Sequence, residues 1–533
     1  MSKDRLYIFD TTLRDGAQTQ GVDFSVEDKE KIASALDNLG VDYIEGGWPG
    51  ANPTDTEFFQ KNHKYRNAKL TSFGMTKRSG RSADNDTGLS ALLNAKTSAV
   101  CLVGKSWDFH VDIALGISNE ENLENIKETA KHFIKANKEF MFDAEHFFDG
   151  YKSNPNYAIK CIKAAYDQGA RWVVLCDTNG GTLPHEVTKI VSEVAKVIPG
   201  KNLGIHAHND TGNAVSNSLA AVLSGVRQVQ GTINGLGERC GNANLMSLIP
   251  TFFLKNEFSS KFELNIKSGN IKNLTQCSRL LDEILNRKPN KHLPYVGAAA
   301  FSHKGGLHVS AVQKDPKTYE HIKPEDVGNI RNIVISDQSG KSNIISRLKT
   351  INIDIEENDP KIKKLLNEVK DREFIGYSYD GADASFELLA RRIIGEIPRY
   401  ISITEYDVSV KKNSLGEIIS SAKAQLEVDG EKIICEGEGN GPVNALDNAI
   451  RQNVDRLAKY SNYLKDLKLV DYKVRILNTG TEAVTRVSIE STDSKGKNWF
   501  TIGVSTNIID ASFKALIDSL DYKLFKDNAP ASI

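Results

Sequence analysis

The segment Leu203-Gly-Ile-His206-Ala-His208-Asn-Asp210 decides the fold, because it joins an apolar strand-like start to a pair of histidines. Residues i and i+2 point to the same side of a β-strand but to different sides of a helix. If the segment is a strand, both imidazoles enter one space, as the binding of a divalent metal requires. Two surface histidines would give the same pattern, so the interpretation depends on further ligands elsewhere in the chain.

Strand-like and helical segments alternate on both sides of this segment. Ser25 begins one helix and Gly40 ends it, and residues 122–136 and 184–197 are also typical helices. An alternation of eight strands with helices over about 250 residues predicts a (β/α)8 TIM barrel. An open doubly wound sheet is the alternative, but no Gly-x-Gly-x-x-Gly motif follows the first strand. The eight predicted strands are residues 6–10, 41–45, 70–73, 99–103, 139–142, 171–175, 203–205 and 228–233.

Polar residues gather where these strands are predicted to end, which is the face of a barrel that carries catalysis. Any one of them could be a helix cap or a satisfied buried residue, but the whole set indicates an active site. They are Arg14 and Asp15 after the first strand, Glu45 at the second, Asp143 and Glu145 after the fifth, Asp177 to Asn179 after the sixth, His206 and His208 at the seventh, and Asn242 after the eighth.

Two imidazoles and two oxygen ligands form a predicted metal site. Asp15, His206 and His208 supply three ligands, and the amide oxygen of Asn242 is a fourth candidate. Such a set leaves coordination positions for water and substrate, as catalytic sites do. It does not distinguish Mg²⁺, Mn²⁺, Co²⁺ and Zn²⁺. A purely structural metal is the alternative, and the absence of cysteine ligands argues against it.

Composition describes an ordinary globular protein of more than one domain, since 533 residues exceed one hydrophobic core. A net charge of -1 gives no attraction to nucleic acid or to an anionic membrane. The sequence has no signal-peptide pattern and no apolar run of membrane-spanning length. The six cysteines are widely spaced, without a Cys-x-x-Cys pair. We therefore expect a cytoplasmic protein that binds neither nucleic acid nor membranes.

The alternation ends near residue 265, and a duplication follows later in the chain. Residues 444–450 recur as residues 510–516, and Ala445 and Ala511 give an offset of 511 − 445 = 66. Three strand-like runs precede the helix in each copy, which predicts a duplicated βββα module. A dimerisation domain without a regulatory role is the alternative. The expected division is a barrel at 1–265, a small helical connecting subdomain at 266–395, and the duplicated domain at 396–533.

Three motifs resemble the signatures of one enzyme family: Asp10-Thr-Thr-Leu-Arg-Asp-Gly16, His206-x-His208, and Gly237-Glu-Arg-Cys-Gly-Asn-Ala243. They are similar to those of the isopropylmalate, homocitrate and citramalate synthases, which are metal-dependent barrel enzymes that condense acetyl-CoA with a 2-oxo acid. The resemblance extends over nearly the whole chain. Lyases of the same superfamily carry a catalytic cysteine in a longer glycine-rich loop. Cys240, two residues before Asn242, does not match that loop, which favours synthesis.

The resemblance implies a role for each residue on the barrel. Asp15, His206 and His208 bind the metal, and Asn242 is an additional or outer ligand. Arg14 and Thr178 hold the oxo acid, with Glu45 expected beside them, and Glu145 belongs to the acid–base machinery.

Two residues beyond the barrel are also implicated by the resemblance. His308 and Tyr319 would enter the active site of the partner in a homodimer, although without the resemblance they would be surface residues. Whether Glu145 or His308 removes the methyl proton of acetyl-CoA stays open.

The oxo acid is predicted to be pyruvate. Residues 16–21 and 45–50 are most similar to those of the family members that use pyruvate. The product would then begin a threonine-independent route to isoleucine, so isoleucine is expected to inhibit through the duplicated domain. The alternatives are an isopropylmalate synthase acting on 2-oxoisovalerate and, from another class, an amino-acid sensor without catalysis.

Overall fold

The computed structural model describes residues 3–333, 341–356, 358–379, 382–414, 416–457, 459–477 and 483–532. It consists of two compact units. Unit 1 comprises Met1–Phe301 and Ile322–Arg331, and unit 2 comprises Ser302–His321 and Asn332–Ile533. The three-part division at residues 265 and 395 remains a prediction.

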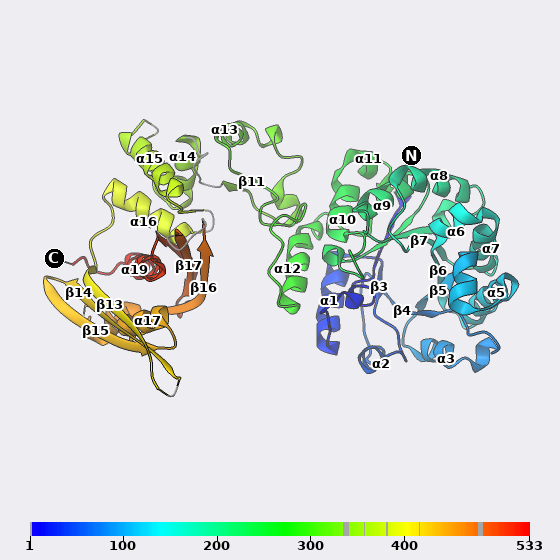
Figure 1. Cartoon of the computed structure of the whole chain (residues 1–533). Helices are drawn as coiled ribbons and strands as arrows, with labels where there is room; N and C mark the ends of the chain where they lie inside the picture. The colour runs from blue at the N-terminus through cyan, green and yellow to red at the C-terminus, as the bar shows by residue number, and fades with distance from the viewer. Residues whose placement is uncertain are drawn as a thin grey trace. The chain divides into compact units, whose positions relative to one another are not determined.

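A closed barrel of eight parallel strands dominates unit 1, as predicted (Figure 1). Parallel strands need helical crossovers, which explains the alternation seen in the sequence. The strands are β2 (Tyr7–Asp10), β3 (Tyr43–Glu45), β4 (Lys69–Met75), β5 (Ala99–Lys105), β6 (Glu139–Glu145), β7 (Trp172–Asp177), β8 (Leu203–Ala207) and β9 (Gln228–Gly231). A short parallel pair, β1 (Asp4–Arg5) with β10 (Phe262–Glu263), lies outside the barrel.

Helices surround the strands. The first of them begins with a capping box between Ser25 and Asp28 and ends at Gly40, whose φ of 102° is left-handed. Its buried stripe includes Ile32 and Leu36. In unit 1 the helices of seven residues or more are α1 (Val26–Leu39), α2 (Pro53–Gln60), α3 (Thr87–Asn94), α5 (Asn119–Lys135), α6 (Phe147–Ser153), α7 (Pro155–Tyr166), α8 (Pro184–Val194), α9 (Ala214–Leu223), α10 (Leu245–Leu254) and α12 (Leu274–Ile284).

Five strands, β4 to β8, extend beyond their predicted ends, and in β6 and β7 the added residues include candidate site residues. Asp143 and Glu145 lie within β6 rather than after it, and Asp177 is the last residue of β7. Their backbones pair with the neighbouring strands although their side chains are polar. The apolar pattern therefore stops before the hydrogen-bonded ladder does, and the prediction of where these strands end was wrong by two or three residues.

The barrel interior below the polar strand ends is filled mainly by aromatic side chains. Phe9, Tyr43, Phe73 and Trp172 are all buried there, together with Met141. Phe9 and Tyr43 stack with ring centroids 5.6 Å apart. This packed floor leaves the polar face at the carboxyl ends of the strands as the place for a site.

Unit 2 begins with short elements. The strand β11 (Ser302–His303) pairs in parallel with β12 (Asn332–Ile333). The helices that follow are α13 (Gly306–Lys314), α14 (Lys341–Thr350), α15 (Pro360–Phe374) and α16 (Asp383–Ile394). This part is helical, as predicted for the connecting segment.

The duplicated βββα module is also confirmed. The first strands of the two copies begin at Ser402 and Lys468, so the offset is again 468 − 402 = 66. Each copy is a three-stranded antiparallel sheet followed by a helix. The first copy is β13 (Ser402–Lys412), β14 (Ile418–Val428), β15 (Glu431–Gly439) and α17 (Pro442–Gln452), and the second is β16 (Lys468–Ile476), β17 (Thr485–Thr492), β18 (Asn498–Ser505) and α19 (Ile508–Lys526).

Helix α16 is joined to this module by polar contacts. Arg392 binds Asp518 and Asp521 of α19, each at 2.9 Å, and Ser385 donates to Asp518. A deletion that began after residue 395 would therefore expose a face of α16 that the module covers.

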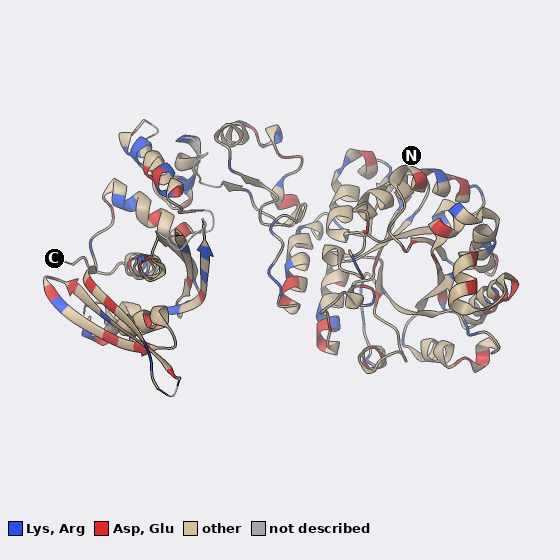
Figure 2. Cartoon of the chain, in the orientation of Figure 1, with Lys and Arg blue, Asp and Glu red and all other residues tan. Residues whose placement is uncertain are grey.

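Charges of both signs are interspersed over the helices of each unit (Figure 2), in keeping with the net charge of -1. In the described part of the chain, every helix is too short or too polar to cross a bilayer.

Candidate active site and metal centre

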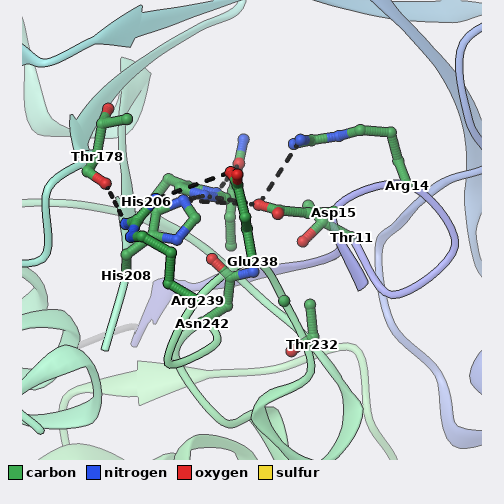
Figure 3. Close-up of polar contacts among 12 residues, drawn as sticks. Thr11, Arg14, Asp15, Thr178, His206, His208, Thr232, Glu238, Arg239 and Asn242 are labelled. Atoms are coloured by element: carbon green, nitrogen blue, oxygen red, sulfur yellow. Dashed lines mark hydrogen bonds and ion pairs between the residues drawn. The ribbon is translucent and has the colours of Figure 1, made fainter. Parts of the chain in front are cut away.

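Asp15, His206 and His208 converge at the carboxyl end of the barrel (Figure 3). Asp15 Oδ2 lies 3.1 Å from Nε2 of His206 and 3.8 Å from Nε2 of His208. The two Nε2 atoms are 3.3 Å apart. All three side chains are buried. His206 lies in β8 and His208 directly follows it, and the two rings point to the same side, as the His-x-His spacing predicts.

Two oxygens of this cluster are buried with no hydrogen-bond donor among the described residues. They are Oδ1 of Asp15 and Oδ1 of Asn242. A buried acceptor left unpaired costs free energy, and a ligand bound at this place would remove that cost. Two imidazole nitrogens and two oxygens are a ligand set that fits a divalent metal.

A glycine-rich loop places Asn242 beside the histidines. The backbone of Asn242 pairs with His208, and its N–H donates to Gly235 O. A Cβ on Gly241 would stand 2.0 Å from that same carbonyl, and a Cβ on Gly237 would stand 2.2 Å from Asn242 Nδ2. Glycine is required at both positions because any side chain would displace the fourth candidate ligand.

Burial and neighbouring charges set the protonation of the cluster. Burial together with His206 lowers the pKa of His208 to about 3, so its imidazole is neutral and offers a lone pair. Burial opposes charge on Asp15, but Arg14 and His206 outweigh it and hold the Asp15 pKa well below its usual range. Burial likewise opposes charge on His206, yet its hydrogen bond to Asp15 raises its pKa.

Arg14 lies on the other side of Asp15, as Figure 3 shows, with its Nη1 3.6 Å from Oδ2. Its Nε donates to Glu45 at 2.6 Å, and its guanidinium lies 4.0 Å from the centre of the Phe73 ring. Burial raises the pKa of Glu45 to about 7, and Arg14 opposes that rise. Glu45 and Phe73 therefore hold the guanidinium in one orientation.

Glu145 belongs to a neighbouring group of side chains. Its carboxylate accepts a short hydrogen bond from Lys105 Nζ, and it lies within 4.8 Å of ring nitrogens of His110 and His146. Thr178 is close to this group, because its hydroxyl accepts from the backbone N–H of His146. The roles of Glu145 and Thr178 toward substrate remain predictions.

His308 and Tyr319 lie in unit 2, whereas the metal cluster lies in unit 1. His308 is on α13, and its ring stacks on Tyr319 with centroids 4.2 Å apart. Their entry into a partner's active site remains a prediction.

Sequence reasoning missed three residues that hold the site in place: Phe73 beneath Arg14, Lys105 beside Glu145, and Gln230 beside His206. Gln230 could have been found, because Gln228 and Gln230 alternate with apolar residues on β9 and so both face the interior. Lys105 ends β5, but nothing in the local sequence indicates its partner.

Three family models match successive parts of this chain. The HMGL-like family model matches residues 5–274, which contain every candidate ligand. A homocitrate synthase post-HMGL domain-like model matches residues 295–374, and the LeuA allosteric (dimerisation) domain matches residues 380–524.

Curated relatives match along the whole chain. The (R)-citramalate synthase of Aquifex aeolicus is 50% identical over 529 residues, covering 98% of each chain. That of Geobacter sulfurreducens is 49% identical over 525 residues, covering 97% of each. The chain belongs to the (R)-citramalate synthase family.

Isopropylmalate synthases match this chain less closely than these two citramalate synthases do. A probable 2-isopropylmalate synthase of Methanopyrus kandleri is 31% identical over 521 residues, covering 96% of this chain and 97% of the relative. The matches to the Aquifex and Methanopyrus relatives cover nearly all of each chain, so the difference in sequence identity, 50% against 31%, is not caused by partial overlap. The resemblance that the three motifs indicate is confirmed.

Proposed function

We propose that the chain condenses acetyl-CoA with pyruvate and water to form (R)-citramalate and CoA. The observation that carries this proposal is the buried Asp15–His206–His208 cluster, held beside Arg14 in a chain of the (R)-citramalate synthase family. A sensor without catalysis would have no use for such a cluster.

Asp15, His206 and His208 would hold a divalent metal, with Asn242 Oδ1 as a further ligand. When bound, such an ion acts as a Lewis acid toward the oxygens of a 2-oxo acid. Mg²⁺, Mn²⁺ and Zn²⁺ all suit two nitrogen and two oxygen ligands.

Arg14 would bind and orient the oxo acid. Its guanidinium is fixed by Glu45 and Phe73, and its Nη1 is aimed at the same space as the metal ligands. A positive donor that is already in position stabilises charge that develops on the ketone oxygen without having to reorganise. Thr178, directly after β7 and next to the histidine strand β8, would complete the oxo-acid pocket.

The methyl group of acetyl-CoA must lose a proton before it attacks the ketone. Glu145 can serve as the base on the barrel, since its carboxylate is at a strand end and Lys105 fixes its position. His308 of the partner subunit is the other candidate. Hydrolysis of the thioester then releases CoA and drives the condensation forward.

Substrate choice provides the first test. CoA release from acetyl-CoA is measured with pyruvate, 2-oxobutyrate, 2-oxoisovalerate and 2-oxoglutarate in separate assays. We expect the highest kcat/KM with pyruvate. One or two extra methylenes are worth roughly 1–3 kcal/mol in a pocket, so 2-oxoisovalerate should be about 10- to 200-fold poorer. A preference for 2-oxoisovalerate would make the protein an isopropylmalate synthase.

Regulation by isoleucine is part of the proposal. The duplicated module matches the LeuA allosteric (dimerisation) domain, and metal-ligand clusters of the described residues lie in the barrel unit rather than in this module. Because (R)-citramalate precedes isoleucine, that amino acid is the expected effector, acting on a dimer.

The second test adds isoleucine, leucine or valine to the full-length enzyme and records the initial rate. We expect isoleucine to inhibit at concentrations where leucine and valine do not. The full chain is used because truncation after residue 395 would expose the face of α16 that binds α19. Inhibition by leucine alone would instead assign the enzyme to the leucine pathway.

A further inference from the structure

A buried row of three side chains leads away from the metal cluster into the barrel. His206 Nδ1 is 2.9 Å from Oε1 of Gln230, and Nε2 of Gln230 donates to Oδ1 of Asp143 at 3.1 Å. His206 is on β8, Gln230 on β9 and Asp143 on β6. Gln230 is completely buried, and the other two are at most 5% exposed. The sequence motifs do not include Gln230, and the mechanism above does not use it.

The direction of these hydrogen bonds follows from the chemistry of each group. Asp143 Oδ1 accepts from the NH2 group of Gln230, and its carboxyl group also pairs with the Cys101 thiol, while burial raises the pKa of Asp143. With its NH2 group on Asp143, the Gln230 amide turns its oxygen toward His206. A carbonyl oxygen only accepts, so Nδ1 of His206 must carry the hydrogen that lies between them.

The hydrogen on Nδ1 determines whether the other ring nitrogen, Nε2, has a free lone pair. Nε2 is the atom that faces Asp15 and His208, and a neutral imidazole with hydrogen on Nδ1 keeps its lone pair on Nε2. We propose that Asp143 and Gln230 are positioning residues that fix the tautomer and orientation of His206 for metal binding. This inference rests on the metal site of the proposed function.

Strand β9 supplies a matched control. Gln228 is as fully buried as Gln230 and faces the same interior two residues earlier, but its Nε2 contacts Met141 Sδ at 3.7 Å instead of a metal ligand. Methionine conserves the volume of glutamine approximately. Gln230→Met and Gln228→Met therefore remove the same polar group from the same strand, and only the first removes the acceptor for His206.

The experiment titrates the metal-free, full-length protein with Mn²⁺ by calorimetry, and circular dichroism and Tm confirm folding. We expect Gln230→Met to raise the Kd for Mn²⁺ by about 10- to 100-fold, as loss of a partner behind a ligand does elsewhere. Gln228→Met should stay within about twofold of the wild type. Equal weakening in both variants, or wild-type affinity in Gln230→Met, would overturn the proposal.

A second test exchanges the polar groups at positions 143 and 230 and leaves the side-chain volumes nearly unchanged. Gln230→Glu alone places a second carboxylate where Gln230 now lies 3.1 Å from Asp143 Oδ1, and Asp143→Asn alone no longer fixes the amide direction. Together they restore a donor at position 143 and an acceptor at position 230. The double variant should therefore bind Mn²⁺ within about threefold of the wild type while each single variant binds at least about tenfold more weakly.

Failure of the double variant to recover affinity would contradict the tautomer argument. If the wild type itself bound no metal, the metal site of the proposed function would fail first, and the positioning role with it. If the wild type bound Mn²⁺ and both single variants bound it as tightly as the wild type, only the positioning role would fail.

Discussion

Replacement of His206 and His208 by alanine is expected to abolish both bound metal and CoA release. The two Nε2 atoms are the only nitrogen ligands that the described residues bring to Asp15, so their removal leaves oxygen ligands alone. Metal content would fall from about one ion per chain to the background of the measurement. Activity with acetyl-CoA and pyruvate would fall to the background of the assay.

The fold should survive this double substitution. Both rings lie at the carboxyl end of the barrel, above the aromatic floor, and in the metal-free chain they neighbour a carboxylate rather than apolar groups. We expect a loss of about 1–3 kcal/mol in the free energy of unfolding, visible as a lower Tm with an unchanged circular dichroism spectrum. His185→Ala is the matched control, because His185 is exposed on α8 and should change neither metal content nor rate.

Metal analysis of the purified proteins and initial rates decide the outcome. Full activity in the double variant would contradict the assignment of the barrel site. Loss of activity with a full metal content would mean that the metal binds at another site and that the two histidines have a different role.

Sequence reasoning succeeded where periodicity alone carries the structure. The His-x-His spacing fixes two rings on one side of a strand, and repeated strand–helix units close only one kind of barrel. Asp15 and Asn242 follow neighbouring barrel strands, β2 and β9, so a closed barrel brings them to the same face. These parts of the site depend on local pattern and topology, which the sequence contains.

The rest of the site depends on side-chain direction across several strands. Lys105 and Glu145 are opposite each other in the β5–β6 register, but the register becomes known only when the strand ends are known. Polar residues inside β6 broke the apolar pattern and made that end uncertain. Gln230 was overlooked because a glutamine has no characteristic motif, although its alternation with Val229 already placed it inside the barrel.

Subunit boundaries are the feature that a single sequence reveals least. His308 and Tyr319 stack on each other within unit 2. Their spacing in the sequence does not indicate whether they act in the active site of their own chain or in that of a partner. The match of residues 380–524 to an allosteric (dimerisation) domain favours a dimer in which exchange is possible. The question is therefore decided by mixing variants.

Mixing two inactive variants is expected to restore activity if His308 acts on the partner subunit. Asp15→Ala lacks a metal ligand, and His308→Ala lacks the residue offered in trans, which should cost about 10²–10⁴-fold in rate if it transfers a proton. In a mixed dimer, the barrel with Asp15 meets the intact His308 of the other chain, while the second site carries both defects. Random exchange makes half of the dimers mixed, so recovery should approach about a quarter of the wild-type rate.

The control mixes Asp15→Ala with Arg14→Ala. Both residues belong to the barrel of their own chain, so each barrel keeps its defect whichever partner it meets, and no mixed dimer contains an intact site. Mass spectrometry of differently tagged chains confirms exchange. Recovery in the first mixture but not in the control would establish action in trans. Confirmed exchange without recovery would mean that each chain builds its own site, and an active His308→Ala variant would remove His308 from the catalytic machinery.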